Sequence, residues 1–206
     1  PAGVSHLDFR HRVYRERLDA RPQPHVLLFA ADEVPAFLNR LRSVAAGARQ
    51  LPAREAFVMD SGMAAIVGAA LDPNAPPERP FMVLDVATSH TVCAAVAGNE
   101  LAGVVEYHTK DITRERLEGL LEELAAGRLD HRQVLAEGGH GAYTRRAAGP
   151  EALKTIIATG PKRRLVEGSR LPMIWGAPLG DNMMTGCAGL LEALRIRKGL
   201  PRPTYL

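Results

Sequence analysis

Aspartate and hydroxyl side chains are concentrated in one short segment, LDVATSHT, at residues 84–91. Asp85 ends an apolar run that is typical of a buried strand, and Thr88, Ser89 and Thr91 follow it in an expected tight turn. Hydroxyls and turn amides can donate hydrogen bonds to phosphate oxygens, while a carboxylate can orient a hydrated magnesium ion. The segment therefore predicts a site for a small anionic ligand with Asp85 beside the metal, unless the turn is purely structural.

Two histidines approach each other if the glycine and asparagine at 98–99 close a hairpin between the apolar runs on either side. A two-residue connection there would pair His90 with Tyr107 and Ser89 with His108. The sequence therefore predicts that the imidazoles of His90 and His108 are neighbours.

A third histidine, His140, lies in the segment GGHGA, which we expect to form a loop that brings it to the other two imidazoles beside Asp85. With Glu106, the three imidazoles could bind a metal ion or act as an acid–base cluster on a small anionic substrate. No HxH or HxxxH spacing supports a metal site, so hydrogen-bonded structural histidines are the alternative.

Short apolar runs bounded by glycine and proline indicate the elements that must position these residues. Strands are predicted at 81–85, 91–97, 100–108, 155–158 and 171–175. After the first three strands, leucines at helical spacing predict a helix that opens at Thr113 and ends at Gly127. The order predicts an α/β fold with a mixed sheet that begins with a hairpin, not a doubly wound sheet.

A last helix is predicted to open at Asp181 or Asn182 and to end at Gly199. Its apolar residues are expected to face the core: Met183, Met184, Cys187, Leu190, Leu191 and Leu194.

The N-terminal third is predicted to contain mainly helices and short strands. Helices are expected at 6–20, 32–47 and 61–70, and strands at 25–29 and 56–59. Four prolines within 72–80 prevent that segment from continuing a helix or entering a central strand. We therefore place a domain boundary there, between a first part at 1–75 and a second domain at 76–206.

Three segments resemble, in order and spacing, the actin, Hsp70 and sugar-kinase superfamily: FVMDSGMAAIVGAALD, FMVLDVATSHTVCAAV and PLGDNMMTGCAGLLEAL. The resemblance implies an RNase H-like mixed sheet in an actin-like ATPase fold. The first phosphate loop of that superfamily is near the N-terminus, and nothing before Asp60 supplies it. We therefore expect this chain to be the C-terminal portion of such a protein, lacking an N-terminal domain.

The same resemblance implies ATP and Mg²⁺ in an interdomain cleft, with phosphotransfer or hydrolysis as the reaction. Asp60 would position a water or an acceptor hydroxyl, and Asp85 would hold the metal through water. The residues lining the nucleotide would be Thr88, Ser89 and Thr91 at the phosphates and Gly160 and Lys162 near the base. Ala87 departs from the superfamily pattern, which has glycine there and so lets the backbone approach a phosphate closely. Loss of chemistry in a binding or assembly module is a further alternative.

GGHGA, EYHT, SHT and GDNMMTG together resemble one uncharacterised prokaryotic family, often labelled as pyruvate formate-lyase activating enzymes and expected to have the actin-like fold. A radical-generating activase needs an iron–sulfur cluster bound by several cysteines. The chain has two distant cysteines, Cys93 and Cys187, so we expect neither that cluster nor that activity.

Composition narrows the partners and the compartment. The net charge of +3 and the charged fraction of 24% are not those of a nucleic-acid-binding protein, although the pI is 9.1. No apolar stretch reaches the roughly 18 residues that span a bilayer, and two cysteines in apolar runs are typical of a reducing cytoplasm. We therefore expect a cytoplasmic protein that binds a small anionic ligand, with a missing N-terminal domain or a homo-oligomer as its protein contacts.

Overall fold

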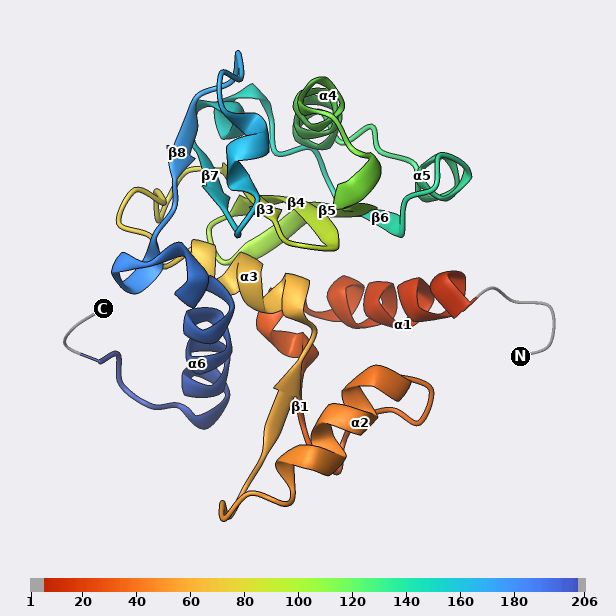
Figure 1. The fold of residues 1–206 in the computed structure, drawn as a ribbon, viewed down its shortest axis with the longest axis vertical. Helices are drawn as coiled ribbons and strands as arrows, with labels where there is room; N and C mark the ends of the chain where they lie inside the picture. The colour runs from red at the N-terminus through yellow and green to blue at the C-terminus, as the bar shows by residue number, and fades with distance from the viewer. Residues whose placement is uncertain (1–5, 204–206) are drawn as a thin grey trace.

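A computed structural model describes residues 6–203 of the chain, and its centre is a six-stranded sheet (Figure 1). The strand order is β6-β5-β4-β3-β7-β8. The strands are β3 (Phe81–Val86), β4 (His90–Ala97), β5 (Glu100–His108), β6 (Gly141–Thr144), β7 (Ile156–Thr159) and β8 (Met173–Trp175). From β3 to β6 neighbouring strands are antiparallel, whereas β3, β7 and β8 are parallel. The predicted mixed α/β sheet is confirmed.

The amphipathic helix α4 (Arg114–Ala125) covers one face of this sheet. Its cap is Thr113, whose hydroxyl accepts a hydrogen bond from the Arg116 amide at 3.2 Å. Four leucines at helical spacing are almost fully buried against the sheet: Leu117, Leu120, Leu121 and Leu124. The short helix α5 (His131–Ala136) lies beside β6. The leucine spacing in the sequence predicted α4 because that spacing alone defines a continuous apolar stripe.

The opposite face is covered by α1 (His6–Ala20) and α3 (Ser61–Ala69), which lie below the sheet in Figure 1. Below them, β1 (Leu28–Ala30) pairs with β2 (Phe57–Met59) and packs beside α2 (Asn39–Ala48). A 3₁₀ turn, η1 (Pro24–Leu27), occupies most of the predicted strand 25–29. The strand prediction was therefore right only for residues 28–29. The helix predicted from residue 32 begins only at Asn39, so its type was right and its start was wrong.

Helix α6 (Thr185–Lys198) packs on α3 through small residues, which corrects the expected burial of its methionines and leucines. Gly68 of α3 and Gly189 of α6 face each other's backbones, where a Cβ would collide with Thr185 O and Ala64 O respectively. This close approach turns the large apolar residues outward. Met183 is 62% exposed and Leu191 is 43% exposed.

The remaining short helices are of the 3₁₀ type and connect the main elements. They are η2 (Thr109–Asp111), η3 (Pro150–Lys154), η4 (Arg163–Val166), η5 (Pro178–Gly180) and η6 (Asn182–Met184).

The lower face shares one apolar core with the N-terminal segments: Leu18 and Val58 belong to the same cluster as Phe81 and Val83. The division at 75/76 stays a prediction. Within residues 6–203, no helix has both the length and the apolar character needed to cross a bilayer.

Candidate functional site

Three histidines meet at one end of the antiparallel half of the sheet. His90 begins β4, His108 ends β5 and His140 immediately precedes β6. Because neighbouring antiparallel strands begin and end at the same edge, residues far apart in sequence come together there. One potential ligand atom from each imidazole lies within 4.8 Å of the other two. The predicted meeting of these three residues is therefore seen in the structure.

The predicted register of the β4–β5 hairpin was wrong by one residue at this end. The pairing starts as expected, with Ala97 opposite Glu100 across the 98–99 turn. A bulge then leaves Ala102 unpaired, so every later pair is shifted and His90 lies directly opposite His108. Directly opposed side chains project from the same face, so the bulge sets the two imidazoles side by side.

The three rings are in mutual contact. The Nε2 atoms of His140 and His108 are 2.8 Å apart, which is a hydrogen bond in which one of the two nitrogens carries the proton. The ring centroid of His90 lies 4.9 Å from that of His108 and 4.5 Å from that of His140. Ser89 Oγ contacts His90 Nδ1 at 2.9 Å, so the turn that carries Ser89 helps to orient this imidazole.

Glu106 lies beside the cluster and is held by α1. Its Oε2 accepts a hydrogen bond from Arg10 Nη2 at 2.7 Å. Its Oε1 is 3.5 Å from His140 Nδ1, without hydrogen-bond geometry. Among the described residues, His140 Nδ1 is the one fully buried side-chain nitrogen or oxygen without a hydrogen-bond partner. The backbone fixes this arrangement, since the His140 amide donates to the Glu106 carbonyl at 2.8 Å.

Electrostatics favours the neutral form of two imidazoles in this cluster, those of His90 and His140. Burial lowers the pKa of His140, and the neighbouring imidazoles of His90 and His108 lower it further, while Glu106 opposes the shift. Burial also lowers the pKa of His90, helped by His108 and by the positive charges of Arg40 and Arg10. A neutral imidazole has one unprotonated nitrogen, which is the form that binds a metal ion.

The second predicted site centres on Asp85, which is not a member of the group of potential metal ligands formed by the three histidines. Asp85 ends β3 opposite Thr159 of the parallel strand β7. Burial raises the pKa of its carboxyl group to about 6. Its side chain makes no hydrogen bond to any part of 6–203, and Gly160 packs so closely that a Cβ there would lie 2.6 Å from Asp85 Oδ1.

The predicted phosphate-lining hydroxyls divide between two faces of the sheet. Thr88 and Ser89 form the exposed turn between β3 and β4. Thr91 projects from the α4 face, where its hydroxyl is hydrogen-bonded to Thr109 Oγ1 at 2.9 Å. Thr109 in turn donates to the Ala87 carbonyl at 2.8 Å. The structure therefore leaves two of the three hydroxyls accessible to a ligand and uses the third to fix the turn.

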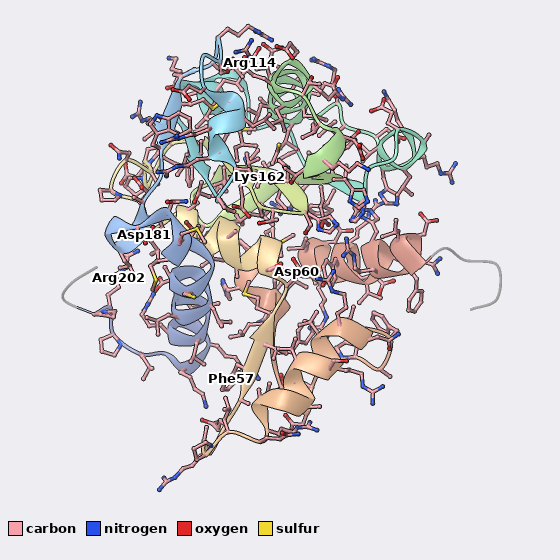
Figure 2. All side chains as sticks on the ribbon, viewed as in Figure 1. Phe57, Asp60, Arg114, Lys162, Asp181 and Arg202 are labelled. Carbon is pink, nitrogen blue, oxygen red and sulfur yellow. The ribbon has the colours of Figure 1, made fainter. Side chains whose placement is uncertain are left out.

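The remaining predicted residues lie on opposite sides of the sheet (Figure 2). The segment with Lys162 is on the side of α4, where the Lys162 amide donates to the Val86 carbonyl at 2.9 Å. Asp60 lies below the sheet at the start of α3, where it caps the helix by accepting from the Gly62 and Met63 amides. Its Oδ2 also accepts a hydrogen bond from Tyr14 of α1 at 3.2 Å.

A small cavity of about 50 Å³ between α1 and the sheet extends from Asp60 to His140 of the histidine cluster. Arg10 and Tyr14 line it on the side of α1, and Glu106 and His140 line it on the side of the sheet. Sequence reasoning missed Arg10 and Tyr14, because the pattern of residues 6–20 predicted a helix but not its contact with the histidine cluster.

The cysteines do not fit an iron–sulfur cluster. Cys93 is buried in β4, where burial raises the pKa of its thiol to about 12, and Cys187 is exposed on α6. Two thiols cannot supply the three or four ligands that such a cluster requires.

The model of the family described as "Putative pyruvate format-lyase activating enzyme (DUF1786)" matches residues 1–165. No curated protein matches the chain by sequence. The matched range contains all three histidines and Glu106. The segments SHT, EYHT and GGHGA, which are separate in the sequence, each contribute one histidine to the cluster.

Proposed function

We propose that this chain, which belongs to the DUF1786 family, binds a divalent transition-metal ion through His90, His108 and His140. Zinc is the metal that we expect. The metal would serve a reaction on a small anionic substrate. The observation that carries the proposal is the convergence of three imidazoles from three strands within 4.8 Å. Imidazole nitrogens suit zinc and neighbouring first-row metals, and three protein ligands are typical of a catalytic zinc site with an open position.

The ring arrangement needs only a small adjustment to accept the ion. Two nitrogens bound to one tetrahedral zinc at about 2.0–2.1 Å from it are about 3.3 Å apart. The Nε2 atoms of His108 and His140 are 2.8 Å apart in the structure, so they would have to separate by a few tenths of an ångström. His108 is exposed, which leaves the cluster accessible to a metal and to a substrate.

A bound metal of this kind would lower the pKa of a coordinated water to about 7 and polarise a substrate oxygen. The charges of this chain favour an anionic substrate. Arg40, at the start of α2, forms no ion pair with any residue from 6 to 203, and its charge acts on His90. An unpaired guanidinium whose charge acts on a metal ligand is suited to attract a carboxylate or phosphate group.

Metal analysis of the purified protein tests this function. We expect one zinc, or another first-row metal, per chain, and loss of that metal in the variant His90→Ala/His140→Ala. His25→Ala is the matched control, because His25 is a partly buried imidazole outside the cluster. Equal metal content in the cluster variant and in the wild type would contradict the proposal, as would a wild-type protein that takes up no metal from a zinc-buffered solution.

A second candidate function is nucleotide binding at Asp85, and one observation favours it. Asp85 is 9% exposed, and its carboxylate has no hydrogen bond within the described chain. It lies near the carboxyl end of β3, where the strand order reverses, because β4, β5 and β6 follow on one side of β3 and β7 and β8 on the other. Ligands of open α/β sheets bind outside the carboxyl ends of parallel strands at such points. In this proposal the chain is the C-terminal portion of an actin-like ATPase fold that binds ATP and Mg²⁺. Asp85 holds Mg²⁺ through water, and the exposed hydroxyls of Thr88 and Ser89 contact the phosphates.

Thermal unfolding with and without Mg-ATP tests the second candidate. A ligand that binds only the folded state raises its stability by about 2.7 kcal/mol at 100 times the dissociation constant. We expect a rise in Tm that disappears in Thr88→Val/Ser89→Ala, which removes the two exposed hydroxyls. No rise with the wild-type chain at millimolar Mg-ATP would count against nucleotide binding by this chain.

A further inference from the structure

We infer that Glu106 is the positioning residue of the histidine cluster and that Arg10 of α1 anchors it. In this arrangement Glu106 accepts a hydrogen bond from the Nδ1–H of His140, so that Nε2 of that imidazole is unprotonated and can bind the metal. This inference rests on the proposed metal site and extends it to a residue of the N-terminal helix.

The two carboxylate oxygens of Glu106 have different surroundings. Oε2 is bound to Arg10 Nη2 at 2.7 Å, in a pair whose side chains are 20% and 26% exposed. Oε1 faces His140 Nδ1 at 3.5 Å. Because Arg10 holds one oxygen, the other is kept pointing at the imidazole. The backbone bond from the His140 amide to the Glu106 carbonyl keeps the two residues in register.

The unpaired Nδ1 atom of His140 explains why this carboxylate is needed. A buried polar atom without a partner is uncommon, because it has lost its hydrogen bonds to water without gaining others. In the structure, Nε2 of His140 is hydrogen-bonded to His108, and Nδ1 is 3.5 Å from Glu106. When Nε2 binds a metal, the proton of the neutral ring must be on Nδ1 and needs an acceptor. Carboxylates commonly accept a hydrogen bond from this N–H group of metal-binding histidines and thereby fix the tautomer and the ring orientation.

The Arg10–Glu106 pair also links metal binding to the docking of α1. Arg10 belongs to a helix that makes other polar contacts. Tyr14 donates to Asp60 at the start of α3, and Asp19 accepts from Tyr143 of β6 at 3.0 Å. If Glu106 orients His140 only while Arg10 holds it, the metal binds more tightly when α1 is docked. By linkage, the metal then stabilises the docked helix to the same extent.

Zinc affinity of Glu106→Ala, measured by competition with a chromophoric chelator, tests the inference. Loss of such a carboxylate partner typically weakens metal binding about 10- to 100-fold, and we expect a loss in that range. Glu137→Ala is the matched control, because Glu137 is also an arginine-bound carboxylate, 2.6 Å from Arg116, and precedes His140 by three residues. Glu106→Gln keeps an acceptor oxygen, so its zinc affinity should lie between those of the wild type and Glu106→Ala. It also provides a test if the alanine variant misfolds.

A second measurement distinguishes positioning from a general structural role. In zinc-loaded wild-type protein, two-bond ¹H–¹⁵N correlation of the His140 ring should show the proton on Nδ1, and Arg10→Met should weaken zinc binding less than Glu106→Ala. If the wild-type protein binds zinc and Glu106→Ala binds it with the same affinity, the role of Glu106 is wrong but the metal site stands. A proton on Nε2 of His140 in the zinc-loaded protein would have the same meaning. A wild-type protein that binds no zinc would overturn the proposed metal function together with this inference.

Discussion

The two faces of the six-stranded sheet are built on different principles. On the α4 face the contacts are apolar, and Leu117, Leu120 and Leu121 are fully buried. Polar groups on this face are paired, as Thr91 is with Thr109. On the α1 face polar contacts join the helix to the sheet, and two buried groups lack hydrogen bonds within the described residues: the Asp85 carboxylate and His140 Nδ1.

The difference between the two faces distinguishes contacts that stabilise the fold from polar groups that a functional site would use. Buried polar groups without partners lower the stability of the folded state, and natural proteins keep them mainly at functional sites. Both of the unpaired groups are on the face that carries the histidine cluster. The α4 face therefore serves as a scaffold, and the proposed metal site lies on the α1 face.

The largest expected effect follows from the scaffold face. Leu120→Ala removes a fully buried side chain, so we expect the free energy of unfolding to fall by about 2–5 kcal/mol. Urea denaturation measures this loss. Leu191→Ala is the control, since Leu191 is 43% exposed on α6 and should change stability by about 0.5 kcal/mol or less. Zinc affinity should be unchanged in folded Leu120→Ala, and a large change would break the division between the two faces.

The next effect is a gain in the free energy of unfolding, expected for a substitution of Asp85 on the α1 face. The pKa of Asp85 is raised from 3.8 to about 6 by burial, so its carboxyl group binds protons more tightly in the folded state than in the unfolded chain. That contribution to stability is fully present below pH 3.8 and is lost as the pH rises through about 6. Asp85→Asn removes the charge, so we expect it to stabilise the protein by about 1–3 kcal/mol at pH 7.5 and to have little effect near pH 4.

A second buried aspartate provides the control for Asp85→Asn. Asp72 is 5% exposed, and its carboxylate accepts hydrogen bonds from the Asn74 amide and side chain and from the Ala177 amide. Asp72→Asn places an amide donor against these donors and should destabilise the protein by about 1–3 kcal/mol. Urea denaturation of both variants at pH 7.5 makes the comparison. Destabilisation by Asp85→Asn would mean that its carboxylate has a partner that stabilises it.

The sequence predicted well those elements that local patterns determine. Successive apolar runs identified β3, β4 and β5, and leucine spacing identified α4. Features that depend on contacts between distant segments were missed. Nothing in the residues around Ala102 indicates the bulge that brings His90 opposite His108. Strand β6 was expected to be part of a loop, because the glycines of GGHGA obscure its short pattern.

The site was only half predictable for the same reason. The sequence could group the three histidines through a hairpin and a glycine-rich segment. It could not predict the Arg10–Glu106 pair that lies beside them. Arg10 is 96 residues from Glu106 in the sequence, and no periodicity connects them. The packing of α6 failed similarly, since the contact between Gly68 and Gly189 reversed the face that the leucines were expected to bury.

The smallest expected effect is a pH-dependent loosening of α1. Burial, the stacked ring of His131 at 3.6 Å and the charges of Arg15 and Arg10 lower the pKa of His11 to about 4, with Asp8 opposing the shift. His131 is itself fixed, because its Nδ1 accepts from the Ala142 amide and its Nε2 contacts Asp8 Oδ1 at 3.1 Å. A detached α1 would restore the ordinary pKa of 6.5. Docking is therefore strongest above pH 6.5 and weakens as the pH falls toward 4.

Hydrogen exchange of the metal-free protein can measure this loosening, with α4 as the internal reference. After correction for intrinsic exchange rates, α1 should lose protection equivalent to about 1 kcal/mol between pH 7 and pH 5, since His11 is partly exposed to screening solvent. Amides of α4 should change less. His11→Phe keeps a ring against His131 without a titrating group, so it should remove most of the difference between the helices. Equal loss of protection in α1 and α4, or the same loss in His11→Phe, would show that the attachment of α1 does not depend on this imidazole.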